Sequence, residues 1–244
     1  MVAGPLTRAL ILAAGRGSRL GRLTESAPKA LMEIAGDSLI ARLVRQCVAA
    51  GVDRVDVVDG HEGKQIERAL ADVSHPVTVD FIRNADYATT NNIVSLGLGL
   101  RHLRDRHRGD LLLIECDVVL EDSVLPRLVA HPAIDLAVVS PFRVGMDGTV
   151  VRLDGEHVRE LITTARQGPF FSHVDTYKTV NIYKLSHGLW SSKLLRLVDW
   201  YADEISSSAY YENAIGMIAY ASGDALASMI IEPETWHEVD DPND

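Results

Sequence analysis

Hydrophobic and polar positions repeat with two different periods along the first half of the chain. Short apolar runs such as Leu111-Leu-Leu-Ile114 alternate with longer segments in which apolar residues recur every three or four positions. Continuous apolar runs of this length are typical of strands whose sheet is covered on both faces, and the longer period is typical of amphipathic helices. Strands and helices that alternate in this way predict a mostly parallel sheet with helices on both sides.

The individual elements follow from these periods. Strands are expected at residues 8–13, 53–59, 77–83, 110–115 and 135–140, and helices at 38–50, 61–71, 91–104 and 123–130. From about Thr149 the pattern changes, because residues 149–153 and 157–163 alternate around Asp154-Gly155, a hairpin signal. Further strands are expected at 177–183, 225–231 and 236–239, with helices at 187–203 and 208–220. The pattern predicts one α/β domain with a Rossmann-like, mostly parallel (mixed) sheet flanked by helices, and a small insertion of strands and helices.

The composition narrows the class of protein. Of 244 residues, 47% are hydrophobic and 24% are charged, which is ordinary for a globular protein with a full core. The formal net charge of -10 disfavours nucleic acid and anionic membrane as partners, since both are negatively charged. No stretch is apolar enough to insert into a membrane, and residues 6–14 lack the layout of a signal peptide. Cys47 and Cys116 lie in apolar stretches and are expected to be buried, reduced thiols of a cytoplasmic protein.

A glycine-containing loop follows the first strand directly. It reads Ala13-Ala14-Gly15-Arg16-Gly17-Ser18-Arg19-Leu20 and ends at Pro28-Lys29. Ligands bind at the carboxyl ends of strands in such sheets, and glycines let backbone N–H groups approach a phosphate closely. Arg19 and Lys29 are suited to neutralise charge on a phosphoryl group. A dinucleotide-binding loop needs a third glycine where this chain has Leu20, and a P-loop needs Gly-Lys-Ser/Thr. The alternative is a strand-to-helix turn with exposed basic residues.

Carboxylates end two strands that are far apart in the sequence. Asp117 follows the apolar run 111–115, and Asp240 lies in the segment Trp236-His-Glu-Val-Asp240-Asp241. A nucleoside triphosphate is bound together with Mg²⁺, which prefers oxygen ligands and usually one or two carboxylates. We therefore expect Asp117 and Asp240 to hold Mg²⁺. Taken singly, each also fits a turn residue at the end of a strand.

Together these motifs resemble the nucleotidyltransferase (NTP-transferase) family, which includes sugar-phosphate pyrophosphorylases and bacterial phosphocholine cytidylyltransferases. The loop and Pro28-Lys29 are similar to the family's signature loop, which wraps the NTP phosphates. The resemblance implies that Arg19 and Lys29 act as catalytic residues and that Ala13, Ala14, Gly15 and Gly17 lie against the nucleotide. It also supports Asp117 and Asp240 as metal ligands, with the family's Asp-x-Asp replaced here by Glu115-Cys-Asp117.

Further segments resemble the phosphocholine and phosphonate cytidylyltransferases within the family. Asn84-Ala-Asp-Tyr87-x-x-x-Asn91-Asn92 is similar to their segment after the third strand, where sugar-phosphate enzymes usually carry a Gln/Pro/Gly-rich segment. The amides of Asn91 and Asn92 suit a base edge, with helix N-capping as the alternative. The segments Asp147-Gly-Thr149, Tyr177-Lys178-Thr-Val-Asn181-Ile-Tyr183 and Tyr210-Tyr211-Glu212-Asn213 also resemble this branch.

The acceptor-binding residues are expected in the last two of these segments. Lys178 suits an acceptor phosphate, with Asn181 beside it, whereas the alternative is an edge-strand lysine facing solvent. Tyr210, Tyr211 and Glu212 suit a cationic group, because aromatic faces and a carboxylate both attract it. The phosphocholine branch carries Tyr-Trp-Asp-Asn at this position. Packing of both tyrosines against the sheet is the alternative.

The expectations combine into one activity. The resemblance implies an Mg²⁺-dependent cytidylyltransferase that joins CTP to a small phosphorylated or phosphonate acceptor, such as phosphocholine or 2-aminoethylphosphonate, and releases pyrophosphate. Residues 1–145 would bind the nucleotide, and residues 146–244 would bind the acceptor and complete the metal site. Two alternatives stay open: a sugar-1-phosphate or inositol-phosphate nucleotidyltransferase, and a catalytically silent relative that binds nucleotide for regulation. A homodimer, or fusion to another enzyme domain in a longer protein, is compatible with the resemblance.

Overall fold

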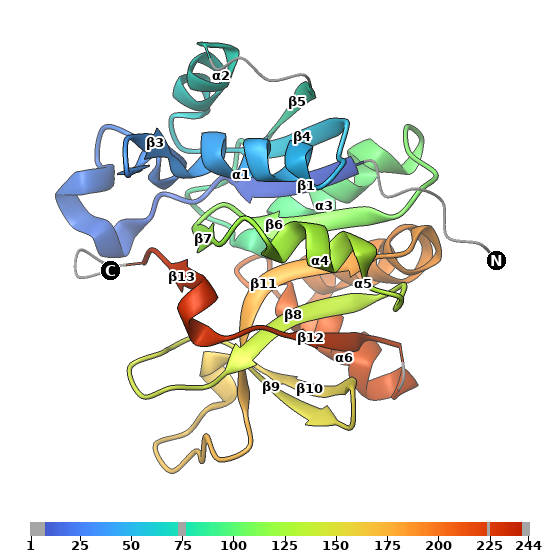
Figure 1. Ribbon diagram of the computed structural model, residues 1–244. Helices are drawn as coiled ribbons and strands as arrows, with labels where there is room; N and C mark the ends of the chain where they lie inside the picture. Colours follow the sequence, from blue (N-terminus) through green and yellow to red (C-terminus); the bar gives the residue numbers. More distant parts are fainter. Residues whose placement is uncertain (1–7, 73–76, 224, 241–244) are drawn as a thin grey trace.

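A nine-stranded sheet runs through the protein (Figure 1). The computed structural model describes residues 8–72, 77–223 and 225–240. In order across the sheet, the strands are β5 (Thr78–Arg83), β4 (Arg54–Asp59), β1 (Arg8–Ala13), β6 (Leu111–Glu115), β11 (Tyr177–Leu185), β8 (Leu136–Pro141), β12 (Ala227–Ile230), β10 (His157–Ile162) and β9 (Val150–Asp154). The expected mixed α/β sheet is confirmed.

The sheet changes direction at its middle strand. β5, β4, β1 and β6 run parallel to one another, as the alternation of strands and helices predicts. β11 is antiparallel to both of its neighbours, β6 and β8, and β12 returns parallel to β8. β9 and β10 form the expected hairpin, whose turn contains Gly155 at a φ of +58°. The prediction of a mostly parallel sheet therefore holds for the first four strands, and the second half adds mainly antiparallel pairs.

Helices cover both faces of the sheet. α1 (Leu39–Ala49), α2 (Gly63–Asp72) and α4 (Val124–Ala130) pack on the face that carries Ile11 and Ile114. α3 (Asn92–Arg104), α5 (Leu195–Trp200) and α6 (Glu212–Ser222) pack on the face that carries Leu10 and Leu113. Figure 1 shows α1 and α4 crossing in front of the sheet. Side chains alternate between the two faces along a strand, so each continuous apolar run contributes residues to the hydrophobic core on both faces of the sheet.

Several short elements were not predicted. These are β2 (Glu33–Ile34), β3 (Asp37–Ser38), β7 (Val118–Leu120) and the 3-10 helices Ser18–Thr24, Lys29–Leu31, Thr164–Arg166 and Pro233–Thr235. β13 (Trp236–Glu238) was expected, but its pairing with β7 was not. The helix predicted at 187–203 consists of α5 between two π-helical segments, Leu189–Leu194 and Tyr201–Ile205. Apart from Ser18–Thr24, these unpredicted elements have only two or three residues and are too short to show a hydrophobic period.

The cysteines and the helices also bear on the class of protein. Cys47 and Cys116 are both buried free thiols, as predicted. Of the helices in the described ranges, none combines the length and the hydrophobicity needed to cross a bilayer.

Candidate active site

A cavity of about 770 Å³ lies at the carboxyl ends of β1 and β6, where ligands bind in sheets of this class. The loop after β1, the end of β6, the start of α3 and parts of β11 and α6 form its wall. Most of the predicted site residues line it: Ala14, Gly15, Gly17, Arg19, Lys29, Asn91, Asn92, Asp117, Lys178, Asn181, Tyr210, Glu212 and Asp240. The fold therefore collects into one cavity residues that are scattered along the sequence.

The loop after β1 is open toward the cavity. Gly17 has a φ of +63°, in the left-handed region that favours glycine, and precedes the helix Ser18–Thr24. A Cβ on Gly17 would lie 3.1 Å from the Lys29 Cβ, so a larger residue would press on the lysine stem. A Cβ on Gly15 would meet no atom within 4 Å, so this part of the backbone faces open space. Backbone N–H groups presented in this way can approach a phosphate closely.

Lys29 lies between two carboxylates. It follows Pro28 at the start of the helix Lys29–Leu31 and is 7% exposed. Its Nζ donates to Asp117 Oδ2 at 2.8 Å and to Asp240 Oδ1 at 2.6 Å. Burial by itself lowers the pKa of Lys29, but the two carboxylates outweigh burial and leave the pKa above its ordinary value. Lys29 is therefore a cation at neutral pH.

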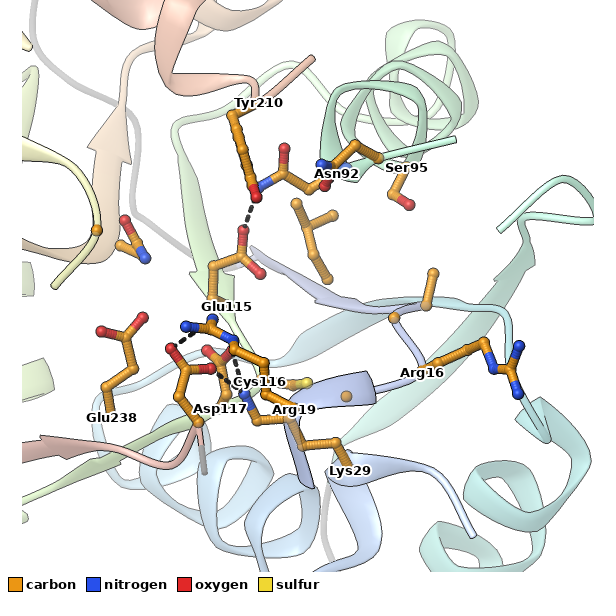
Figure 2. Close-up of a pocket in the computed structure, with 18 of the residues that line it drawn as sticks. Arg16, Arg19, Lys29, Asn92, Ser95, Glu115, Cys116, Asp117, Tyr210 and Glu238 are labelled. Carbon is orange, nitrogen blue, oxygen red and sulfur yellow. Dashed lines mark hydrogen bonds and ion pairs between the residues drawn. The ribbon is translucent and has the colours of Figure 1, made fainter. Parts of the chain in front are cut away.

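Arg19 approaches the same acidic group from the solvent side. Its Nη2 donates to Asp240 Oδ2 at 2.7 Å, and its Nη1 lies 3.4 Å from Asp147 Oδ2. The side chain is 60% exposed, so part of the guanidinium faces the open cavity. Figure 2 shows Arg19, Lys29 and Asp117 in one group, whereas Arg16 extends away from it. Two cations thus meet at the cavity wall of a protein whose net charge is -10.

A small two-stranded sheet brings the carboxylates together. β7 begins directly after Asp117 and pairs antiparallel with β13. The Val239 N–H donates to the Asp117 carbonyl oxygen at 2.8 Å and extends this pairing. As a result, one carboxylate oxygen each of Asp117, Glu238 and Asp240 lies within 4.8 Å of the others. Asp241, the other acidic residue of this segment, lies outside the described residues.

The three carboxylates suit a hard divalent cation. Mg²⁺ takes oxygen ligands and commonly one or two protein carboxylates. Asp117 Oδ1 is buried without a hydrogen-bond partner in the described part of the protein, which is costly unless a ligand satisfies it. The donor set and this oxygen both fit Mg²⁺. Glu238 was not predicted as a ligand, although it begins the Glu-Val-Asp segment that pointed to Asp240.

Glu238 also connects the acidic group to Lys178. The Lys178 side chain is 3% exposed, and its Nζ lies 2.9 Å from Glu238 Oε2 and donates to the Thr179 carbonyl oxygen at 3.1 Å. Burial raises the pKa of Glu238 to about 7 against the opposing charge of Lys178. β11 lies in the middle of the sheet. The alternative of an edge-strand lysine facing solvent is therefore wrong.

The start of α3 carries the two predicted amides. Asn91 is the N-cap residue of α3, and its side chain accepts a hydrogen bond from the Asn92 N–H at 2.8 Å. The side chain of Asn91 thus caps the helix, which was the alternative to a contact with the base. Asn92 Nδ2 donates to Glu115 Oε1 at 3.0 Å and to Glu212 Oε2 at 3.4 Å. Burial raises the pKa of both glutamates, and Asp117 and Glu212 raise that of Glu115 further. Asn91 and Asn92 line the cavity, and Asn92 is also held by two protein carboxylates.

Two predicted site residues lie in the core instead of on the cavity wall. Ala13 is the last residue of β1, is 2% exposed and packs with Ile11 in one core. Tyr211 is fully buried, and its ring meets Tyr183 edge-on with centroids 6.1 Å apart. Tyr211 therefore packs in the core, and the prediction that its side chain contacts the acceptor is wrong. Tyr210 is 48% exposed and lines the cavity.

The cavity also contains residues that sequence reasoning did not propose as site residues. Glu115 appeared only as a departure from Asp-x-Asp, and Asp147 and Thr149 only as part of a resembling segment. Thr149 Oγ1 donates to Glu212 Oε1 at 3.4 Å. Glu115 carried a sequence signal, since it ends the buried strand β6 just before Asp117.

Comparisons with known proteins point to one domain family. Residues 9–196 match the MobA-like NTP transferase domain. Over 239 residues the chain is 34% identical to CMP-5′-(3-aminopropyl)phosphonate synthase of Streptomyces rubellomurinus. This alignment covers 97% of this chain and 37% of that protein. Over 117 residues it is 33% identical to 2-aminoethylphosphonate cytidylyltransferase of Lancefieldella rimae, covering 48% of this chain and 45% of that protein. The chain thus spans less than half the length of these curated relatives.

Solved structures share the fold over nearly the whole chain. CTP:phosphocholine cytidylyltransferase from Streptococcus pneumoniae aligns with a TM-score of 0.76 at 20% identity, covering 98% of this chain and 95% of that one. The inositol-1-phosphate CTP transferase from T. maritima aligns with a TM-score of 0.77 at 16% identity, covering 99% and 92%. At these identities the likeness shows the fold alone.

Proposed function

Because this chain belongs to the MobA-like NTP transferase domain family, we propose that it is a cytidylyltransferase acting on a small phosphonate or phosphate acceptor. The observation that carries the proposal is the meeting of Lys29 with Asp117 and Asp240 beside the glycine loop. CTP as donor and an aminoalkylphosphonate as acceptor are supported by the names of the two curated relatives. The products would be a CMP-linked acceptor and pyrophosphate.

The reaction needs charge neutralisation and positioning more than a protein nucleophile. An oxygen of the acceptor's phosphonate or phosphate group attacks the α-phosphorus of CTP in line, and the bond to pyrophosphate breaks. Lys29 is buried and cationic, and Arg19 keeps part of its guanidinium free, so both can stabilise the charge that spreads over the phosphoryl oxygens. The glycine loop contributes backbone N–H groups to the phosphates.

Mg²⁺ is the cofactor that the acidic group suits. Asp117 and Asp240 would hold it, with Glu238 as a further carboxylate in reach. Bound there, Mg²⁺ would neutralise charge on the nucleotide phosphates. Lys29 now donates to both aspartates, so it would release at least one carboxylate oxygen to the ion and turn toward the phosphates.

The two halves of the chain divide the substrates between them. We assign the nucleotide to the first 145 residues, with Ala14, Gly15, Gly17, Asn91 and Asn92 on the cavity wall. Residues from 146 onward hold the acceptor through Lys178, Asn181, Tyr210 and Glu212, and they complete the metal site through Asp240. Lys178 is the cation on this side for the phosphonate or phosphate of the acceptor.

Two other functions remain as outcomes of the test. A sugar-phosphate or inositol-phosphate acceptor would suit the same fold, since an inositol-1-phosphate CTP transferase shares it. A silent relative would bind nucleotide without turnover, but such a protein has no need of two cations held beside three carboxylates at the cavity wall.

Pyrophosphate release distinguishes these functions. The protein is incubated with Mg²⁺, each of the four NTPs, and each of phosphocholine, 2-aminoethylphosphonate, 2-hydroxyethylphosphonate and the hexose 1-phosphates. We expect release with CTP and an aminoalkylphosphonate. Faster release with a hexose 1-phosphate would move the assignment to the sugar-phosphate enzymes. Tight CTP binding without release from any pair would identify a silent relative.

A further inference from the structure

Glu115 and Glu212 lie on one wall of the cavity and share a single donor. Asn92 Nδ2 donates to Glu115 Oε1 at 3.0 Å and to Glu212 Oε2 at 3.4 Å. The orientation of the Asn92 amide is set independently, because its Oδ1 accepts from the Tyr211 N–H at 2.9 Å. Figure 2 shows the Glu115 carboxylate pointing toward Asn92. One neutral amide group thus serves two carboxylates.

Neither carboxylate forms an ion pair in the described part of the protein, and Lys29 and Lys178 act on Glu115 and Glu212 only from a greater distance. The ion pairs around the cavity join Lys29 to Asp117 and Asp240, Arg19 to Asp147 and Asp240, and Lys178 to Glu238. Glu212 is only 5% exposed, and its other oxygen accepts from Thr149 Oγ1. Buried carboxylates are normally paired with a cation. A cationic group on a ligand would supply the counter-charge that this wall of the cavity lacks.

Asn181 supplies an independent sign of a ligand at the same wall. It is 9% exposed and lines the cavity, and its Oδ1 is buried without a hydrogen-bond partner among the described residues. Its backbone has a φ of +59°, a left-handed conformation that costs energy for most residues other than glycine, asparagine and aspartate. An unpartnered, buried carbonyl oxygen at the cavity wall points to a donor on the ligand.

The sheet brings Asn181 and Glu115 to the same cavity. β11 pairs antiparallel with β6, and Ile182 opposite Ile114 is the last pair of this register at the cavity end. Asn181 and Glu115 each lie one residue beyond that pair, and both line the cavity.

We infer that Glu115, Asn181 and Glu212 form a binding site for a primary ammonium group, which selects acceptors that carry a primary amine. The inference rests on the proposed transfer to a phosphonate or phosphate acceptor, whose negative end would face Lys29 and Lys178. A primary ammonium has three N–H donors, and the site offers three oxygen acceptors. A hydroxyl offers one donor and a trimethylammonium none, so both would leave buried oxygens unsatisfied.

The wild-type protein tests this selection directly. Pyrophosphate release from CTP is measured with 2-aminoethyl- and 3-aminopropylphosphonate and with their hydroxyl and trimethylammonium analogues of the same chain length. Each hydrogen bond to a charged group is worth about ten- to a hundredfold in affinity. We expect the kcat/KM for the better amine to exceed that of its two analogues by at least about a hundredfold. Values within threefold of one another would overturn the inference.

Three substitutions test the individual residues. Glu115→Gln and Glu212→Gln remove the charge at constant size, and Asn181→Gly removes the amide while tolerating the positive φ. In each variant the ratio of kcat/KM for the amine to that for the hydroxyl analogue should fall at least about tenfold, through the KM of the acceptor. Glu204→Gln, an exposed glutamate on Tyr201–Ile205, is the matched control. A ratio that stays constant, or a change only in the KM for CTP, would contradict the assigned contact.

Binding separates the failure of this inference from the failure of the proposed function. Calorimetry with the wild-type protein, Mg²⁺ and CTP compares 2-aminoethylphosphonate with 2-hydroxyethylphosphonate. If no acceptor is turned over but the amine binds at least tenfold more tightly, the transfer reaction is wrong and the ammonium site stands. If acceptors are turned over without regard to the amine, the transfer reaction stands and the ammonium site is wrong. Equal or absent binding without turnover removes both.

Discussion

The Nζ of Lys29 donates a 2.8 Å hydrogen bond to Oδ2 of Asp117, which lies 88 residues further along the chain. Lys29 follows the glycine loop, and Asp117 lies two residues after the end of β6. The same ammonium also donates to Asp240, so a cation and two acids are held together at the cavity wall. A group that can contact phosphate and groups that can bind metal are therefore already adjacent in the folded chain.

Replacing Lys29 by methionine should reduce turnover strongly. Removing one donor that stabilises charge in the transition state costs about 100- to 1000-fold in kcat. Methionine keeps most of the buried stem, so circular dichroism should show an intact fold. Pyrophosphate release with CTP and the best acceptor measures the effect. A kcat within threefold of the wild-type value would remove Lys29 from the catalytic residues.

The same variant should bind Mg²⁺ differently when no nucleotide is present. In the wild-type protein the Lys29 ammonium lies between Asp117 and Asp240, and an incoming ion has to displace it. Without the ammonium, two neighbouring carboxylates are left without this counter-charge, which favours a cation. Calorimetric titration of nucleotide-free protein should show at least about threefold tighter Mg²⁺ binding than in the wild type, a change of about 0.7 kcal/mol. Weaker binding in the variant would mean that Lys29 does not compete with the ion.

Asp117→Asn should abolish turnover while leaving the fold intact. The amide keeps the size of the side chain but removes the charge that a divalent cation needs from its ligand. The variant should also lose the response of turnover to added Mg²⁺ after treatment with a chelator. Asp105→Asn, on an exposed residue after α3, serves as the control and should behave as wild type. Normal Mg²⁺-dependent turnover by Asp117→Asn would disprove the metal assignment.

A buried ion pair joins the parallel strands β1 and β4 and should contribute strongly to the stability of the protein. Arg8 Nε and Nη2 donate to the two oxygens of Asp56 at 2.6 and 2.8 Å, and the two residues are 4% and 0% exposed. Asp56→Asn removes the bidentate counter-charge of the buried guanidinium and leaves it only the more exposed Asp80, whose Oδ2 lies 3.6 Å from Arg8 Nη2. Breaking a buried pair in this way should cost up to about 3–5 kcal/mol in the free energy of unfolding. Urea unfolding measures the loss.

The double variant Arg8→Met, Asp56→Leu is the matched comparison. It removes both charges and keeps apolar volume, so it should recover most of the lost stability. If the double variant is as unstable as the single one, the cost comes from packing and not from an uncompensated charge.

Stability should also fall below neutral pH through His107. Burial lowers the pKa of this imidazole, which stacks on Trp190 with ring centroids 6.1 Å apart. The unfolded chain takes up the proton near pH 6.5, and the folded protein takes it up only at lower pH. The free energy of unfolding therefore falls as pH drops below about 6.5, by at most about 1.4 kcal/mol per pH unit from this group, and levels off below the folded-state pKa.

Urea unfolding of the wild type and of His107→Gln at pH 7.5, 6.5 and 5.5 checks this dependence. Glutamine keeps a donor for the Asp110 carbonyl oxygen, which His107 Nε2 contacts at 2.9 Å. The variant should lose less stability than the wild type between pH 6.5 and 5.5. Groups near His107 that also affect its pKa are Arg8, Asp56, Asp110 and His187. An unchanged slope would assign the pH dependence to other groups.

The sequence by itself determined the sheet and the residue types of the site. Apolar runs such as Leu111-Leu-Leu-Ile114 predict buried strands because a strand covered on both faces cannot alternate with polar residues. Glycines with Arg19 and Lys29 predict a phosphate-facing loop because their chemistry is local to one short segment. The placement of Asp117 at a strand's carboxyl end likewise follows from the chain alone.

Only the tertiary structure decided which distant groups meet. The sequence predicted β13 as a strand and, through the family resemblance, Asp117 and Asp240 as ligands of one ion. The three-residue strand β7 and its pairing with β13 were not predicted, and this pairing adds Glu238 to the two aspartates. The antiparallel pairing of β11 with β6 brings Asn181 and Glu115 to one cavity. The start of α6 buries Tyr211 in the core while Glu212 faces Asn92. Such contacts depend on how the whole chain closes its two cores, and no local pattern of residues encodes them.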